Sequence, residues 1–280
     1  MSDRQIPATN RRKPASICPV RIFSIVLAAG LLLTTVSPAM AWHAVFGLEE
    51  PGLQVGWTYQ GEKGPESWGD LSPEFAACNG ERQSPIDLRG GRRMQYSPMS
   101  FRYRSNALSV HNDGRSVRVD VSSGSYMVAG GHEYQLTGFH FHVPGEHRIN
   151  GVAADMELQL EHRDHRGRIA VVAVPMNVGR RMNSTLSRIW DHIPSGEGQR
   201  FYGRQTGINP RFLLPSDHSY FSYVGSLTEP PCTEGVEWFV LAKPVEVDVS
   251  YVQKFLRALG PNARPVQPVN GRPVLATLRR

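Results

Sequence analysis

The sequence lacks internal repeats, low-complexity linkers and any break in composition, which argues against a repeat protein or several domains. It also lacks a basic stripe with interleaved aromatic residues, so we expect no nucleic-acid partner. The net charge of +6 does not alter this, because five basic residues and one acidic residue lie within residues 1–41. With 280 residues and 40% hydrophobic content, the chain is expected to form one globular domain, over residues 42–280, with a substantial core.

No apolar run after residue 41 is long enough to span a membrane. The run at residues 22–36 follows a basic region and precedes a small-residue pattern at 39–41. This order is typical of a secretory signal peptide, residues 1–41, cleaved before Trp42. An uncleaved anchor is the alternative, and Arg11-Arg12 leaves twin-arginine export open beside general secretion. We therefore expect a periplasmic or secreted protein.

Cysteine is scarce, with three residues in the chain. Cys18 lies in the predicted signal peptide, so Cys78 and Cys232 remain as an even pair in an exported chain. A disulfide between them is the simplest expectation. It would close a loop of about 154 residues and contribute about 4–5 kcal/mol on the chain-entropy model.

Helix signals are few. The best candidate helices are residues 182–193 and 250–259, and the helix signal over 42–85 is weak. Short alternating strands separated by Gly, Asn and Asp fill residues 100–174, at 101–104, 117–121, 126–128, 156–161 and 169–174. This spacing predicts a mainly β domain with one large, mostly antiparallel sheet and a few short surface helices.

The stretch 138–147 alternates histidine with phenylalanine. On a β-strand, His140 and His142 share one face, and Phe139 and Phe141 share the other. Two imidazoles at this spacing are typical of a metal-binding pincer, and two buried rings behind them would hold it rigid. A buried strand with two hydrogen-bonded structural histidines is the alternative.

A second informative segment lies at residues 225–235. Pro230-Pro231 restricts the backbone after Thr228. A fixed threonine hydroxyl and amide beside a disulfide suit a site that orients a small reactant. A rigid turn with no such role is the alternative.

Several short motifs, taken in order, resemble the α-class carbonic anhydrases over nearly the whole mature chain. They are Trp57-x-Tyr59, Gly64-Pro65-x-x-Trp68, Cys78 with Gln83-Ser84-Pro85-Ile86, Phe139-His140-Phe141-His142, Glu146-His147, Met156-Glu157, Ser226-Leu227-Thr228 with Pro230-Pro231, and Arg264-Pro265-Val266-Gln267-Pro268. The resemblance implies a large, mostly antiparallel sheet and reversible hydration of CO2 to bicarbonate. The enzyme would be a lyase, a carbonate dehydratase, with zinc held by three histidines.

The resemblance also implies roles for individual residues. His140 and His142 would be the first two zinc ligands. Thr228 would accept the hydroxide proton and pass its own proton to Glu146, and Glu157 would support the third ligand. The residues that would wall the apolar CO2 pocket are Val171, Leu227 and Trp238.

The sequence departs from the family at the third ligand, where Gln159 replaces the histidine. A neutral amide oxygen is a weaker zinc donor than an imidazole nitrogen. Glu161 or Glu229 could instead supply a carboxylate, which would give a site of two histidines and one carboxylate.

Four further positions depart from the family pattern. Gly138 stands where the family usually has a glutamine that is hydrogen-bonded to the first histidine. Loss of such a partner typically lowers metal affinity or activity by about ten- to a hundredfold. Arg115 replaces the histidine proton shuttle of fast members and stays protonated. Glu161 replaces a pocket valine and Glu229 follows Thr228, so carboxylates would adjoin an apolar pocket, which is unfavourable unless a cation lies beside them.

These departures leave two main hypotheses. The protein is a zinc-dependent carbonic anhydrase with impaired activity, or it is an acatalytic binding scaffold like the carbonic anhydrase-related proteins. A different metal-dependent hydrolysis is a minor third. Of the remaining histidines we interpret His147 and His162 as structural, His165, His192 and His218 as surface or loop residues, and His43 and His111 as the spare candidates for proton relay.

Overall fold

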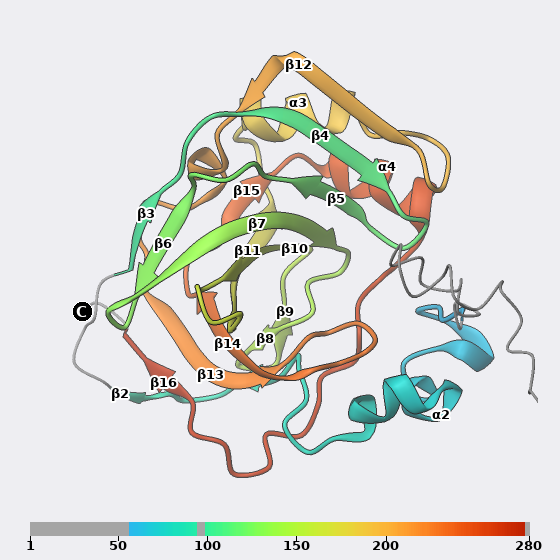
Figure 1. Cartoon of the computed structure of the whole chain (residues 1–280), viewed down its shortest axis with the longest axis vertical. Coiled ribbons are helices and arrows are strands. Elements are labelled where there is room, and N and C mark those ends of the chain that lie inside the picture. The colour runs from blue at the N-terminus through green and yellow to red at the C-terminus, as the bar shows by residue number, and fades with distance from the viewer. Residues whose placement is uncertain (1–55, 94–98, 278–280) are drawn as a thin grey trace, which may run out of the picture. The chain divides into compact units, whose positions relative to one another are not determined.

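The computed structural model describes residues 56–93 and 99–277 (Figure 1). The chain divides into two units, residues 1–53 and 54–280, and the described residues all belong to the second. The predicted signal peptide, its cleavage position, Cys18 and His43 lie outside the described residues. Within the described part, no helix is long and apolar enough to cross a membrane.

The described residues form one large sheet of thirteen strands, which confirms the mainly β prediction. Its main path runs, in spatial order, through β12 (Arg200–Ile208), β4 (Asn106–Asn112), β5 (Val117–Asp120), β7 (His132–His142), β10 (Met156–Arg163), β11 (Ile169–Val178), β14 (Glu234–Leu241), β13 (Tyr220–Ser226), β16 (Leu275–Ala276) and β2 (Arg92–Arg93). The strands off this path are β3 (Ser100–Arg102), β6 (Tyr126–Ala129) and β15 (Val245–Val247).

Most neighbouring strands are antiparallel, as predicted. The described strands of this sheet pair in parallel at three places, between β11 and β14, β11 and β15, and β16 and β2. A second sheet of three short strands consists of β1 (Asp87–Leu88), β8 (Arg148–Ile149) and β9 (Val152–Ala153). The sheet is therefore mixed, with an antiparallel majority.

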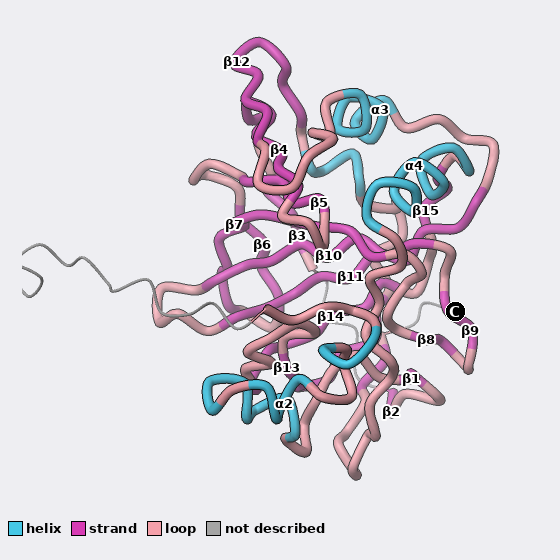
Figure 2. Tube along the Cα trace, turned by 90° about the vertical axis from the view of Figure 1, so that its right-hand side faces the viewer, coloured by secondary structure: helices cyan, strands magenta, loops and turns pink. Residues whose placement is uncertain are grey.

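Both predicted helices are present, as α3 (Ser184–Asp191) and α4 (Val249–Leu259), and they lie near each other in Figure 2. The side chains of Asn183 and Asp248 accept hydrogen bonds from their first-turn amides, which defines where each helix begins. Further short helical segments are α2 (Trp68–Leu71), η1 (Gly61–Lys63), η2 (Pro73–Asn79) and η3 (Pro210–Leu213). The helices before residue 80 were weakly signalled because each is shorter than the periodic pattern that predicts a helix.

The alternation along β7 divides its residues between two environments, as predicted. Phe139 and Phe141 enter the main core, where the ring of Phe141 lies 4.7 Å from that of Trp190 on α3. Burial of a large apolar side chain contributes about 1.5–3 kcal/mol. His140 and His142 face the opposite side of the sheet. The aromatic face therefore anchors the strand that presents the histidines.

The predicted disulfide is confirmed, since Cys78 and Cys232 are bonded with their Cα atoms 4.9 Å apart. The two cysteines pack with Trp57 and Trp68 in a small separate core. The disulfide thus joins the irregular segment before residue 80 to the loop that follows Thr228.

Candidate metal centre

His140 and His142 lie side by side, with ring centroids 4.9 Å apart, and both are buried. The backbone carbonyl of Asn262 accepts a hydrogen bond from His142 Nδ1 at 2.8 Å, so the lone pair of this ring is on Nε2. The Nε2 atoms of both histidines are buried without a hydrogen-bond partner among the described residues. Buried polar atoms are rarely left unpaired without a functional reason. The pair therefore provides two imidazole nitrogens for a metal ion.

Gln159 lies on β10 directly opposite His140. Its Nε2 donates hydrogen bonds to Glu146 Oε2 at 2.8 Å and to Glu157 Oε1 at 2.9 Å. These two carboxylate acceptors identify the amide nitrogen, because a carboxylate oxygen would repel the amide oxygen. The amide oxygen is therefore the atom that Gln159 can offer to a metal.

Behind Gln159, four buried residues form a continuous chain of hydrogen bonds that we call the inner network: Glu157, His147, Tyr223 and Ser84. Glu157 accepts from His147 Nδ1 and from the His147 backbone amide, both at 2.9 Å. His147 Nε2 lies 2.7 Å from the Tyr223 hydroxyl, which donates to Ser84 Oγ at 2.8 Å. Burial raises the pKa of Glu157, but the charge and hydrogen bonds of His147 outweigh burial and lower it to about 2. The structural interpretation of His147 agrees with these contacts.

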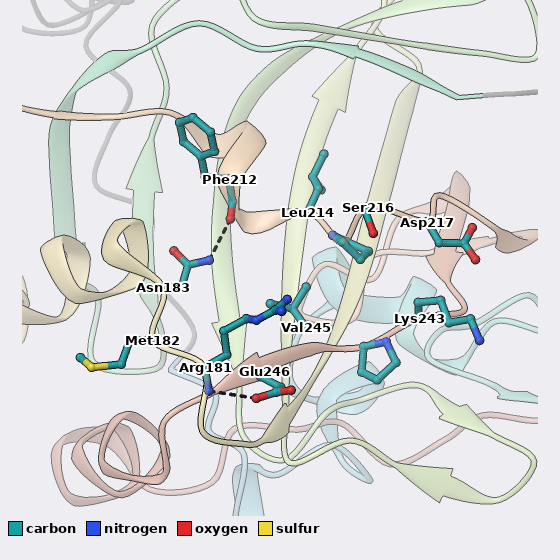
Figure 3. A pocket seen from close by; sticks show the side chains of 12 residues that line it. Arg181, Met182, Asn183, Phe212, Leu214, Ser216, Asp217, Lys243, Val245 and Glu246 are labelled. Carbon is teal, nitrogen blue, oxygen red and sulfur yellow. Dashed lines mark hydrogen bonds between the residues drawn. The ribbon is translucent and has the colours of Figure 1, made fainter.

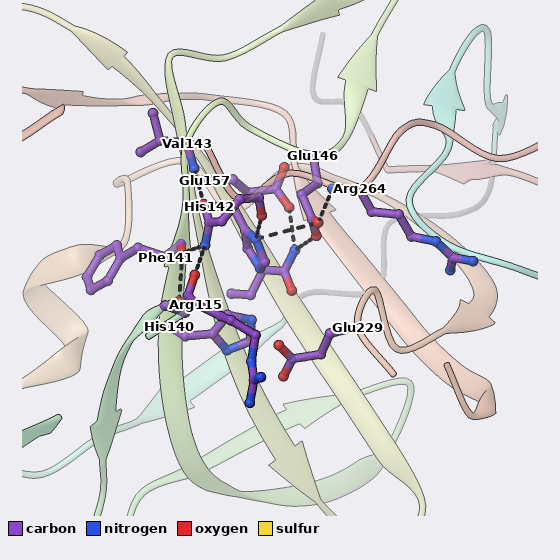
Figure 4. A network of polar contacts seen from close by, with 12 residues as sticks. Arg115, His140, Phe141, His142, Val143, Glu146, Glu157, Glu229 and Arg264 are labelled. Carbon is purple, nitrogen blue, oxygen red and sulfur yellow. Dashed lines mark hydrogen bonds and ion pairs between the residues drawn. The ribbon is translucent and has the colours of Figure 1, made fainter. Parts of the chain in front are cut away.

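Glu146 is held from two sides (Figure 4). Its Oε1 accepts from the backbone amide of Arg264 at 2.9 Å, and its Oε2 accepts from Gln159. Thr228 is buried, but no hydrogen bond joins its hydroxyl to Glu146 within the described part of the chain. The expected proton relay through Thr228 stays a prediction.

Sequence reasoning missed Arg118, which joins both carboxylates in the expected pocket. Its guanidinium donates to Glu161 Oε1 and to Glu229 Oε1, each at 2.7 Å, and we call these three residues the Arg118 bridge. Burial lowers the pKa of Arg118, but the two carboxylates outweigh burial and raise it overall. Burial likewise raises the pKa of Glu161, whereas His140 and Arg118 lower it to about 2. Arg118 and Glu161 are therefore both ionised near neutral pH.

The register of the strands explains how Arg118 reaches the site. Arg118 on β5 is the direct partner of His140 on β7, which in turn is the partner of Gln159 on β10. Direct partners on adjacent strands present their side chains on the same face. The local alternation of β5 shows that Arg118 and Asp120 share a face. It does not show which strand lies beside them.

The three residues expected to wall the pocket lie together. Val171 and Trp238 are buried direct partners on β11 and β14, and Leu227 packs against the same apolar cluster. Glu161 is the direct partner of Val171 on the other side of β11. A charged side chain therefore adjoins the apolar wall, with Arg118 as its neutralising cation.

The other singled-out residues lie apart from the two Nε2 atoms. His162 is buried 2.7 Å from the Tyr103 hydroxyl, and burial lowers its pKa to about 4, which agrees with a structural role. His111 lies on β4 beside Asp120, and burial lowers its pKa. The guanidinium of Arg115 lies 4.5 Å from the centre of the Trp57 ring. His165 is exposed, and His192 and His218 are partly exposed.

The structure does not bring a third acidic or imidazole ligand to the histidine pair. Within residues 56–93 and 99–277, no three His, Cys, Asp or Glu side chains gather as a metal-binding group. Arg118 holds Glu161 and Glu229, and Glu161 Oε1 lies 2.9 Å from His140 Nδ1 instead of Nε2. Gln159 remains the neighbouring residue that could complete the set.

A separate pocket of about 500 Å³ lies between the segments that precede α3, follow η3 and precede β15 (Figure 3). Its Glu246 carboxylate accepts from the backbone amides of Arg180 and Arg181, and Asn183 donates to the Phe212 carbonyl. None of the residues discussed for the metal centre lines this pocket. It provides no catalytic group for the site.

The fold and the site together define a class of protein, in which a large mixed sheet buries an imidazole pair beside an apolar wall. Residues 63–278 match the family model of the eukaryotic-type carbonic anhydrases, and the chain belongs to this family. A carbonic anhydrase from Nostoc sp. (strain PCC 7120 / SAG 25.82 / UTEX 2576) is 40% identical over 230 residues, which cover 80% of this chain and 87% of that protein.

Solved structures agree with this assignment. The α-carbonic anhydrase from Thermovibrio ammonificans, in complex with the inhibitor sulfanilamide, is 40% identical with a TM-score of 0.76, covering 79% of this chain and 99% of that one. Dioscorin complexed with ascorbate is 34% identical with a TM-score of 0.73, and the match covers 79% of this chain and 97% of that one. The family typically depends on zinc and acts on CO2 and bicarbonate. If active, this chain is a carbonate dehydratase, a lyase.

Proposed function

We propose that this protein binds zinc weakly and catalyses the reversible hydration of CO2 at a low rate. The observation that carries the proposal is the pair of buried, unpaired Nε2 atoms of His140 and His142. An imidazole nitrogen that costs folding free energy when left unpaired is stabilised by a metal ion. The apolar cluster of Val171 and Trp238 supports CO2 as the substrate.

The residues present fit zinc in part. The hydrogen bond from His142 Nδ1 to the Asn262 carbonyl orients the ring so that Nε2 can coordinate a metal. Ligand histidines typically have an outer partner of this kind. Gln159 would add its amide oxygen, and this neutral donor is the reason to expect weak binding. When bound, zinc supplies a water acidified to a pKa of about 7, which is nucleophilic at neutral pH.

The chain's own residues would hold and shield the substrate. The apolar wall excludes water from CO2, and Glu146 is fixed by the Arg264 amide. We propose that Thr228 orients the nucleophile, which would require its hydroxyl to form a hydrogen bond to Glu146 when the site is loaded. Arg115 cannot carry protons to solvent because it stays protonated, so proton transfer would limit the rate.

One observation favours a second candidate, an acatalytic binding protein. Both Glu146 oxygens already accept a hydrogen bond, from Gln159 and from the Arg264 amide, and Thr228 forms none with them within the described residues. Dioscorin, a related structure, is complexed with ascorbate, so the fold can hold a small organic molecule. In this second case the pocket would bind a ligand without converting it.

The decisive experiment measures zinc stoichiometry and CO2 hydration on the same preparation. We expect the purified protein to take up close to one zinc ion per chain on titration, and to lose it on dialysis against a chelator. The control variant, with His140→Ala and His142→Ala, should take up none. Zinc uptake with slow stopped-flow hydration that the control lacks supports the enzyme. Zinc uptake without hydration supports the binding protein, and no zinc uptake overturns the zinc proposal.

We also propose export of the chain by its first 41 residues to the periplasm or the medium. Subcellular fractionation followed by N-terminal sequencing tests this, with Trp42 as the expected first residue of the exported protein. An intact N-terminus in the membrane fraction would identify an uncleaved anchor instead.

A further inference from the structure

The two histidines of the pair have different supports. His142 Nδ1 donates to a neutral backbone carbonyl at 2.8 Å. His140 Nδ1 instead lies 2.9 Å from Glu161 Oε1, a short contact that is off the direction of a well-aligned hydrogen bond. His142 Nδ1 also lies 3.5 Å from Glu146 Oε1, so His140 is the histidine of the pair with the closer carboxylate at its far nitrogen.

Glu161 contacts His140 from the adjacent strand β10. On the histidine's own strand, the neighbouring position on the same face is a glycine without a side chain. The residue two positions before His140 is Gly138, and Glu161 is its direct partner across β7 and β10. A small pocket of about 110 Å³ beside Gly138 is lined by Arg118 and Glu161, among other residues. The carboxylate thus comes from the direct cross-strand partner of Gly138, a position with no side chain of its own.

Arg118 restricts the position of this carboxylate. The oxygen that contacts His140, Glu161 Oε1, also accepts from Arg118 at 2.7 Å. Arg118 is fixed in turn by Glu229 and by its place opposite His140 on β5. About a quarter of the Arg118 and Glu161 side chains is exposed. Arg118 and Glu161 therefore each have two partners: Arg118 has Glu161 and Glu229, and Glu161 has Arg118 and His140.

We propose that Glu161 is the positioning residue of His140. Its carboxylate favours the proton on Nδ1 of His140, so the lone pair is on Nε2. This Nε2, like that of His142, is buried without a hydrogen-bond partner among the described residues. Arg118 holds Glu161 in this role. A carboxylate at the far nitrogen makes an imidazole a stronger metal ligand than a neutral partner does, which offsets part of the weakness of Gln159.

This role differs from that of a metal ligand. The two ring nitrogens of an imidazole project from different edges of the ring, so an atom in contact with Nδ1 is not placed to share a metal with Nε2. Only the consequence for metal binding depends on the proposed function. The tautomer of His140 can be measured on the metal-free protein.

The test uses three variants of the mature chain: Glu161→Val, which removes the acceptor, Glu161→Gln, which keeps a neutral acceptor, and Glu229→Gln. Glu229 shares Arg118 with Glu161, but no ion pair joins it to His140 in the described structure. Nitrogen-15 spectra of the imidazole rings, with His140→Ala for assignment, report the tautomer of each histidine without metal. Cobalt titration then reports metal affinity and ligand geometry.

We expect His140 to carry its proton on Nδ1 in the wild type and in Glu229→Gln. In Glu161→Val we expect a shift toward the Nε2–H form at His140 alone, and a metal affinity lower by about ten- to a hundredfold. Glu161→Gln should keep the tautomer and lose less affinity. This graded series separates positioning from a general loss of structure, because His142 reports on the same fold.

An unchanged His140 tautomer in Glu161→Val overturns the proposal, and so does an equal shift at His142. If the wild type binds no metal but the tautomer shifts as expected, positioning holds and the zinc proposal fails. If metal binds and both Glu161 variants match the wild type in tautomer and affinity, the zinc proposal holds and positioning fails.

Discussion

The inner network meets the histidine pair where Glu157 on β10 is the direct partner of His142 on β7, yet the hydrogen bonding of the two regions differs. In the inner network, each side chain from Glu157 to Ser84 contacts the next at 2.7–2.9 Å. In the histidine pair, the Nε2 atoms of His140 and His142 have no partner within the described residues. The two regions are joined at Gln159, which donates to Glu157.

The difference separates residues that stabilise the fold from residues kept available for a ligand. A buried network in which every polar group is hydrogen-bonded contributes to a unique native state. Loss of one member leaves its partners buried without a hydrogen bond, which is costly. Unpaired buried nitrogens cost stability and persist where a function needs them. Substitutions in the two regions should therefore change different measurable quantities.

The largest expected effect is on folding. Glu157→Ala removes the carboxylate that two groups of His147 contact, so it should lower the free energy of unfolding by about 3–5 kcal/mol. Urea denaturation followed by tryptophan fluorescence measures this. The matched variant Glu229→Ala leaves Arg118 its second carboxylate, Glu161, and should therefore cost less. Equal costs for the two variants would contradict the division between the regions.

The disulfide should stabilise the fold and, through Arg264, the position of Glu146. Its removal by Cys78→Ser with Cys232→Ser should lower the free energy of unfolding by about 2–5 kcal/mol. Arg264 donates to the Cys78 carbonyl at 3.0 Å, and its own amide donates to Glu146. We therefore expect faster hydrogen exchange at the Arg264 amide.

The amide of Leu160, on the core strand β10, serves as the internal reference and should change less. Chemical denaturation without reductant and residue-resolved exchange provide the two measurements. A uniform increase in exchange would show that the disulfide acts on the whole domain and not on this side of the site.

Gln159→His should act on the histidine pair. An imidazole nitrogen replaces a neutral amide oxygen, so we expect zinc affinity to rise by more than about a hundredfold, beyond what an outer partner contributes. Competition with a chromophoric chelator measures the change. Gln159→Asn, a shorter amide, is the control and should show no gain.

The same variant tests what limits catalysis, because it also releases the Glu146 oxygen that Gln159 occupies. We expect CO2 hydration to rise with zinc affinity. If the variant binds zinc fully but remains inert, the carboxylates of the Arg118 bridge are the greater obstacle. An unchanged affinity would show that Gln159 does not face the metal.

The last expected effect is a dependence of stability on acid pH, which is absent near neutral pH. Glu157 has an ordinary pKa of 4.5, and in the folded protein its pKa is lowered to about 2. A lowered folded pKa adds stability above pH 4.5 that is lost as pH falls toward 2. Glu161 has the same shift and adds to the same window.

Thermal denaturation between pH 5 and about pH 2 tests this dependence. The slope of stability against pH should be lower in Glu157→Gln than in the wild type, whereas the exposed Glu62→Gln should keep the wild-type slope. A slope that is identical in all three proteins would show that Glu157 does not control acid stability.

Much of the fold followed from local pattern. Alternation at period two predicted that Phe139 and Phe141 enter the core while His140 and His142 face the other side, and the apolar periodicity predicted α3 and α4. The even cysteine pair predicted the disulfide. These features depend on residues within one element or on simple counting, so the linear sequence contains them.

The surroundings of the histidine pair required the tertiary structure. Arg118 lies twenty-two residues before His140, and only the pairing of β5 with β7 places it opposite that histidine. The role of Gly138 depends on Glu161 lying across from it on β10. Local sequence determines which face a side chain takes, but register between strands depends on long-range contacts, so the charged support of this site was decided by the sheet.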